Sequence, residues 1–79
     1  MALYIVIRKL IDHPTSAEYA FGTCEDRLGQ LKIEKATGNI MLVEPAPGDD
    51  TGALYQRAMY KIQKHWAAGE LPDVTCWAS

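Results

Sequence analysis

A helical repeat of apolar residues runs through residues 51–68, TGALYQRAMYKIQKHWAA. One stripe of this segment, with Leu54 at its edge, gathers the side chains expected to face a core: Tyr55, Ala58, Met59, Ile62 and Trp66. Residues 49–51, Asp-Asp-Thr, can cap the first turn. Gly69 followed by Pro72 is typical of a helix end. These signals predict one amphipathic helix over residues 51–68.

Four segments before this helix have the alternation or the β-branched composition of strands: residues 3–12, 17–24, 30–35 and 39–44. Short turns join them, so an antiparallel meander is the most economical topology. Residues 73–79 alternate again and predict either a short edge strand or a strap across the sheet. The sequence therefore predicts one α+β domain over residues 1–79. It is a four-stranded antiparallel meander followed by one C-terminal helix, with a possible short fifth edge strand in the tail.

Composition excludes several classes of protein. The 79 residues are 48% apolar, which is enough for a core, and their formal net charge of −2 does not favour broad nucleic-acid binding. The longest apolar run, residues 3–7, is far shorter than the ~20 residues of a membrane span, and no secretory signal is expected. We therefore expect a cytoplasmic protein with no membrane segment, in which Cys24 and Cys76 are reduced thiols.

Neither a metal-binding nor a catalytic spacing is present in the sequence. There is no C-x-x-C pair, no pair of close histidines and no glycine-rich phosphate loop. In the predicted topology, His13 and His65 lie at one end of the sheet. Cys24 and Cys76 lie at the other end, so neither a zinc cage nor a Cys–His catalytic pair is expected. The sequence thus predicts no catalytic residue, no metal and no cofactor.

A stripe of cationic side chains is the first candidate binding surface. Arg57, Lys61 and Lys64 fall within about 60° on the surface of the predicted helix, and His65 is next to them. Such a stripe can meet phosphate groups or an acidic partner. The helix dipole also favours bases in the later turns of a helix, so a purely structural explanation stays open.

The second candidate surface is the sheet face that a single helix cannot cover. Tyr4, Val6 and Leu10 share one face of the first strand, and Trp77 of the tail is expected to shield part of it. Monomers rarely expose apolar patches larger than a few hundred Å². We therefore expect these four residues to form an interface, and the chain to be a homodimer.

Three hypotheses about function follow in order of preference. The first is a non-enzymatic interaction or regulatory module that self-associates through a sheet face or edge. The second is a small nucleic-acid-binding domain that uses the helix stripe, and the third is an enzyme. A steep loss of binding with salt would favour nucleic acid, whereas a salt-insensitive dimer would favour self-association.

Overall fold

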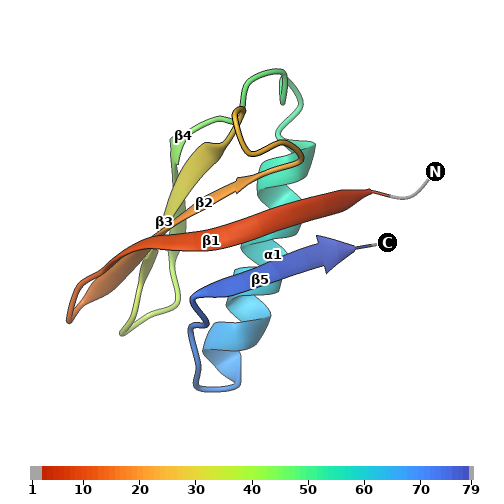
Figure 1. Cartoon of the computed structure of the whole chain (residues 1–79). Coiled ribbons are helices and arrows are strands. Elements are labelled where there is room, and N and C mark those ends of the chain that lie inside the picture. The colour runs from red at the N-terminus through yellow and green to blue at the C-terminus, as the bar shows by residue number, and fades with distance from the viewer. Residues whose placement is uncertain (1–2, 79) are drawn as a thin grey trace.

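The computed structural model, which describes residues 3–78, forms one five-stranded antiparallel sheet with a single helix against one face (Figure 1). In chain order the elements are β1 (Tyr4–Asp12), β2 (Ser16–Gly22), β3 (Gly29–Glu34), β4 (Ile40–Glu44), α1 (Ala53–Ala67) and β5 (Val74–Ala78). The strand order across the sheet is β4-β3-β2-β1-β5. The predicted meander with a C-terminal helix is confirmed, and the tail is a fifth strand at the edge beside β1.

The helix begins two residues later and ends one residue earlier than predicted. Gly52 precedes it with a left-handed φ of 75°, so the chain is still turning at this position. The Asp49 carboxylate reaches over that turn and accepts hydrogen bonds from the backbone N–H groups of Leu54 and Tyr55, both at 3.1 Å. Asp49 thus satisfies two of the free donors of the first turn, as a capping residue does, from a position before the helix.

The core lies between α1 and the sheet face that α1 covers. The fully buried large side chains of this core are Ile5, Ile7, Tyr19, Phe21, Leu31, Ile33 and Ile62. Two members of the predicted helix stripe, Ala58 and Ile62, are fully buried, and the other three are half-buried. The side chains of β2 and β3 that face this core alternate along each strand: Tyr19 and Phe21 from β2, and Leu31 and Ile33 from β3.

Three hydrogen bonds fix the loop that leads from α1 into β5. Lys9 Nζ donates to the carbonyl of Leu71 at 2.8 Å, and the Tyr19 hydroxyl donates to the carbonyl of Pro72 at 2.6 Å. The backbone N–H of Lys9 donates to the carbonyl of Asp73 at 2.7 Å. These bonds hold the loop against β1 and β2, so β5 starts beside β1. The 15-residue α1 is too short and too polar to cross a bilayer, and the described chain has no other helix.

Candidate interaction site at the β5 edge

The pairing of β5 with β1 decides which side chains share a face. Ile5 lies opposite Trp77, and Val6 lies opposite Cys76. Because opposite residues point to the same side of a sheet, Ile5 and Trp77 face α1, and Val6 and Cys76 face away from it. Trp77 packs against the core cluster. It is therefore not on the face of Tyr4 and Val6, where the sequence had placed it, because the tail pairs beside β1 instead of crossing the sheet.

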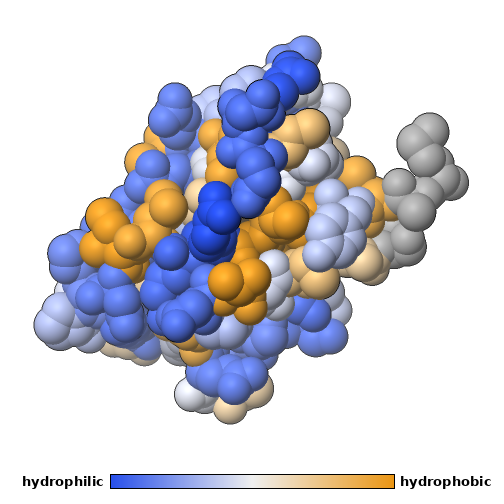
Figure 2. Space-filling model, in the orientation of Figure 1, coloured by the Kyte–Doolittle hydropathy of each residue, from blue (hydrophilic) through white to orange (hydrophobic). Residues whose placement is uncertain are grey.

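The face away from α1, called here the open face, has an apolar patch along β1 and β5. Tyr4 is 56% exposed and Val74 is 68% exposed, while Val6 and Cys76 are half-buried. A hydrogen bond with Cys76 raises the pKa of the Tyr4 hydroxyl above its usual value. In Figure 2, apolar atoms gather over these two strands.

A polar band interrupts the apolar part of the open face (Figure 2). Arg8 forms an ion pair with Glu25 at 2.9 Å, and it lies between Val6 and Leu10 along β1. Leu10 is 50% exposed and sits at a shift in the register with β2, so it lies beyond the band. The continuous patch expected from the sequence is therefore divided, and Leu10 is not part of the patch at the β5 edge.

The backbone of β5 presents an open row of hydrogen-bonding groups. The bond from Lys9 N to Asp73 O shows that the backbone of Asp73 points toward β1. Inward and outward groups alternate along an antiparallel strand, so the N–H and C=O groups of Val74, Cys76 and Ala78 point away from β1. Within the described chain β5 is the last strand on this side of the sheet. These outward groups can therefore pair with another strand.

The β5 edge lacks the features that usually prevent pairing with another strand. Its sequence, VTCWA, has no charged residue and no proline, and its register with β1 is regular. The opposite edge, β4, exposes large apolar side chains at Met41, Leu42 and Val43. Its register with β3 shifts next to Leu42, however, whereas β5, which Pro72 and Asp73 precede, has no register shift along Val74–Ala78. The longer regular row of outward backbone groups is thus on β5.

Two cationic side chains of α1, those of Arg57 and Lys61, and the imidazole of His65 form a line along the helix side of β5. The Arg57 guanidinium lies over the ring of Trp77, 5.3 Å from its centroid, and His65 Nε2 is 3.0 Å from the Thr75 hydroxyl. Lys61 is one helical turn from each of these residues and so belongs to the same line. The line of Arg57, Lys61 and His65 therefore lies above the edge strand.

The charged side chains within α1 and β5 are of one sign, and the acidic Glu70 and Asp73 lie in the loop between the two elements. α1 and β5 together contain three of the chain's eight lysine and arginine residues and none of its ten acidic residues. Lys64, the remaining member of the predicted stripe, lies over the exposed ring of Tyr60, 5.5 Å from its centroid. Arg57, Lys61 and His65 of the predicted helix stripe thus lie beside Trp77 at the β5 edge, and Tyr4 and Val6 lie on the opposite face of the same edge.

Sequence reasoning missed the backbone groups of β5 as the centre of this site. The available signal was an alternating strand with no charge, proline or glycine in its length.

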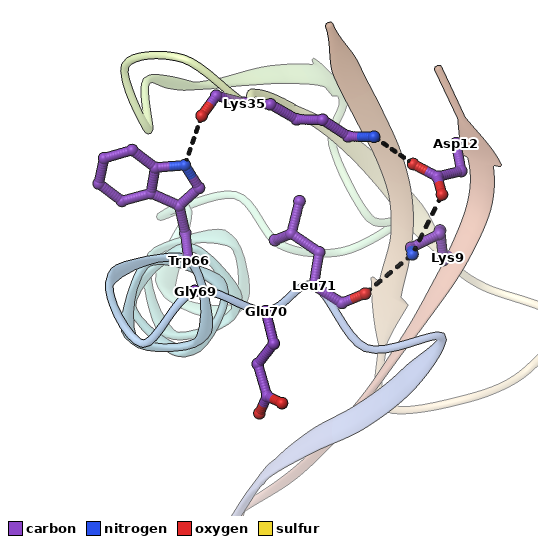
Figure 3. A pocket seen from close by; sticks show the side chains of 7 residues that line it. All are labelled: Lys9, Asp12, Lys35, Trp66, Gly69, Glu70 and Leu71. Atoms are coloured by element: carbon purple, nitrogen blue, oxygen red, sulfur yellow. Dashed lines mark hydrogen bonds and ion pairs between the residues drawn. The ribbon is translucent and has the colours of Figure 1, made fainter. Parts of the chain in front are cut away.

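A pocket of about 440 Å³ lies near the end of α1 (Figure 3). It is lined by Lys9, Asp12, Lys35, Trp66, Gly69, Glu70 and Leu71. Asp12 lies between the two ammonium groups, 2.6 Å from that of Lys35 and 3.7 Å from that of Lys9. Trp66 Nε1 donates to the carbonyl of Lys35 at 2.7 Å. The charges that line this pocket neutralise one another. Its side chains are therefore best explained as a network that holds the α1–β5 loop in place.

Asp12 gives this network a dependence on pH. Its hydrogen bond with Lys35, helped by the charges of Lys35 and Lys9, lowers the pKa of Asp12 below its usual 3.8. The stability from this pair is present above the unfolded-state pKa and is lost as the pH falls through the lower folded-state pKa. We expect Asp12→Asn to destabilise the fold at neutral pH and to flatten the loss of stability below about pH 4. Urea unfolding across this range measures both effects, with Asp26→Asn, an exposed turn substitution, as the control. Parallel profiles for Asp12→Asn and wild type would contradict the role of Asp12.

The cysteines are free thiols, Cys24 exposed and Cys76 half-buried. Between residues 3 and 78, no three histidine, cysteine or acidic side chains are gathered as a metal site. The geometry defines an α+β domain with an open sheet edge, flanked by cations on one face and by apolar side chains on the other. No protein-family model, curated protein or solved structure matches the chain, so similarity gives no guide to its function.

Proposed function

We propose that this chain is a non-enzymatic interaction module that binds an extended segment of another polypeptide by strand addition to β5. The observation that supports this function is the regular, uncharged edge of β5, with outward backbone groups at Val74, Cys76 and Ala78. An added strand pairs with these groups, and its side chains alternate between the two faces of the sheet. Main-chain bonds then supply affinity, and the two flanking surfaces supply selectivity.

Self-association is the form of this function predicted from the sequence, and it stays a prediction. A second copy would add its own β5 to this edge or cover the open face. The ion pair of Arg8 with Glu25 divides that face, which reduces the apolar area that a face-to-face dimer could bury continuously. The edge is therefore the better supported of the two surfaces.

Nucleic-acid binding by the helix stripe is less well supported than protein binding. Arg57 and His65 already contact Trp77 and Thr75 of β5. The two remaining lysines of the stripe would supply few phosphate contacts, and affinity for nucleic acid grows with the number of such contacts.

Selection from a display library of short random peptides tests the proposed function. We expect peptides that bind the wild-type domain and bind Val74→Pro at least about tenfold more weakly, a loss of roughly 1.4 kcal/mol. Proline at this position removes an outward N–H group and places its ring on the edge. Val74→Ile keeps the N–H group, the β-branched shape and the apolar character of the side chain, so it should bind like wild type.

Fluorescence anisotropy measures these affinities, and thermal unfolding shows that both variants are folded. If peptides bind Val74→Pro as tightly as wild type, the binding site is not at β5 but elsewhere, for example at the β4 edge. A library that yields no binder would contradict the interaction function itself.

A further inference from the structure

We infer that the segment bound at β5 alternates apolar and acidic residues, with the acidic residues facing α1. The inference rests on the proposed function, because it names the chemistry of the strand that is added to β5. Two different surfaces flank the edge, and each selects one half of the alternation.

On the helix side, the added residues lie opposite Thr75 and Trp77 and point toward α1. There they meet the line of Arg57, Lys61 and His65. Glu70 of the α1–β5 loop already faces His65, 3.4 Å from its Nδ1. Neither α1 nor β5 contains a carboxylate that could offset the charges of Arg57 and Lys61. An acidic side chain on the added strand supplies this missing charge, whereas a basic one is repelled. Glutamate has the longer reach and suits these positions.

On the open face, the added residues lie opposite Val74 and Cys76. Tyr4 and Val6 of β1 extend the same patch, and the side chains of Tyr4 and Val74 are more than half exposed. An apolar residue on the added strand covers this patch and removes it from water. A charged residue here would lose water and gain no ionic partner from these four residues. Arg8 lies opposite Val74 on the same face, but it is already paired with Glu25 at 2.9 Å. The complementary segment therefore alternates apolar and acidic residues along its length.

A second copy of the chain does not have this chemistry. Its β5 would place Thr75 and Trp77 on the helix side, where the complementary segment carries carboxylates. A two-fold axis at the edge would also bring the Arg57 and Lys61 line of each copy toward that of its partner. Like charges facing each other across an interface oppose association. The charge of α1 thus favours a segment of a different chain.

The experiment uses fluorescein-labelled peptides and anisotropy. The probe is Ser-Val-Glu-Val-Glu-Val-Glu-Val-Ser, and its two analogues carry threonine or lysine in place of glutamate. We expect the glutamate peptide to bind at least about tenfold more tightly than the lysine peptide, and threonine to be intermediate. Added salt should reduce the difference, because exposed charges are screened.

Reversing one charge on the domain tests whether the α1 side chains cause the preference for acidic residues. Lys61→Glu should lower the affinity for the glutamate peptide and raise the affinity for the lysine peptide, each by about tenfold. Lys32→Glu makes the same change in net charge on β3, on the open face and away from α1. This control should bind all three peptides nearly as wild type does.

Four results would overturn the inference. Equal binding of the glutamate and threonine peptides, or an equal loss in Lys32→Glu, would leave strand addition standing without an acidic preference. A dimer in light scattering that Val74→Pro dissociates, with no peptide bound, would make a second copy the occupant. Tighter binding of a labelled single-stranded oligonucleotide than of the glutamate peptide, weakened by Lys61→Glu, would assign the surface to nucleic acid.

Discussion

Replacing Ile62 with alanine is expected to lower the free energy of unfolding by about 2–4 kcal/mol, as large-to-small changes in cores do. Ile62 is fully buried and belongs to the core cluster that joins α1 to the sheet. Alanine removes apolar contacts and leaves a cavity under the helix. A loss of this size is a large share of the stability of a domain this small. Urea denaturation followed by tryptophan fluorescence measures it.

Gln63 provides the matched control, because it is the next residue of α1 and is exposed. Gln63→Ala should change the free energy of unfolding by less than about 0.5 kcal/mol. Equal losses at the two positions would mean that the buried face of α1 is assigned wrongly. The cationic line would then also be misplaced relative to β5, because the rotation of the helix sets both.

Local sequence patterns were sufficient to predict most of the elements. Alternation identified β2 and β3 as strands, and the helical period identified the face of α1 that contains Ile62. The start of α1 was less predictable. Several residues before it are good caps, and the left-handed conformation of Gly52 together with the reach of Asp49 decides where the first turn begins.

The position of β5 could not be predicted from its own residues. Alternation separates Cys76 from Trp77 in either arrangement of the tail, as a strand beside β1 or as a strap across the sheet. The choice is made by contacts distant in sequence, in which Lys9 and Tyr19 hold carbonyls of the α1–β5 loop. The candidate site depends on this placement, because it brings an edge strand under the cationic line of α1.

Sequence periodicity also could not predict that a polar band divides the open face. Arg8 has the same parity as Val6 and lies on the same face, but its pairing with Glu25 depends on how the β2–β3 turn folds back. The register shift at Leu10 depends on pairing with β2. Both features follow from tertiary structure, and both reduce the apolar patch that the sequence predicted.

Gly38→Ala, in the turn between β3 and β4, is expected to lower the free energy of unfolding by more than Gly52→Ala does. Gly38 has a φ of +77°, and a Cβ atom built there would lie 2.7 Å from two atoms of the Trp66 ring. The ring cannot move freely, because its Nε1 donates to the carbonyl of Lys35 at 2.7 Å. An alanine in the left-handed conformation costs about 1–2 kcal/mol, and overpacking costs a further 1–3 kcal/mol. We therefore expect the free energy of unfolding to fall by about 2–5 kcal/mol.

Gly52→Ala separates these two costs. Gly52 has nearly the same φ, +75°, but nothing lies within 4 Å of the position of its Cβ atom. Gly52→Ala should therefore lower the free energy of unfolding by only about 1–2 kcal/mol, which is the cost of the backbone conformation. In a Trp66→Ala background the clash is absent, and Gly38→Ala should then cost as little as Gly52→Ala does. Chemical denaturation of the two single glycine variants, Trp66→Ala and the Gly38→Ala/Trp66→Ala pair gives the coupling energy between Gly38 and Trp66. A coupling near zero would mean that the indole does not rest on this turn, and that the end of α1 is held by the α1–β5 loop alone.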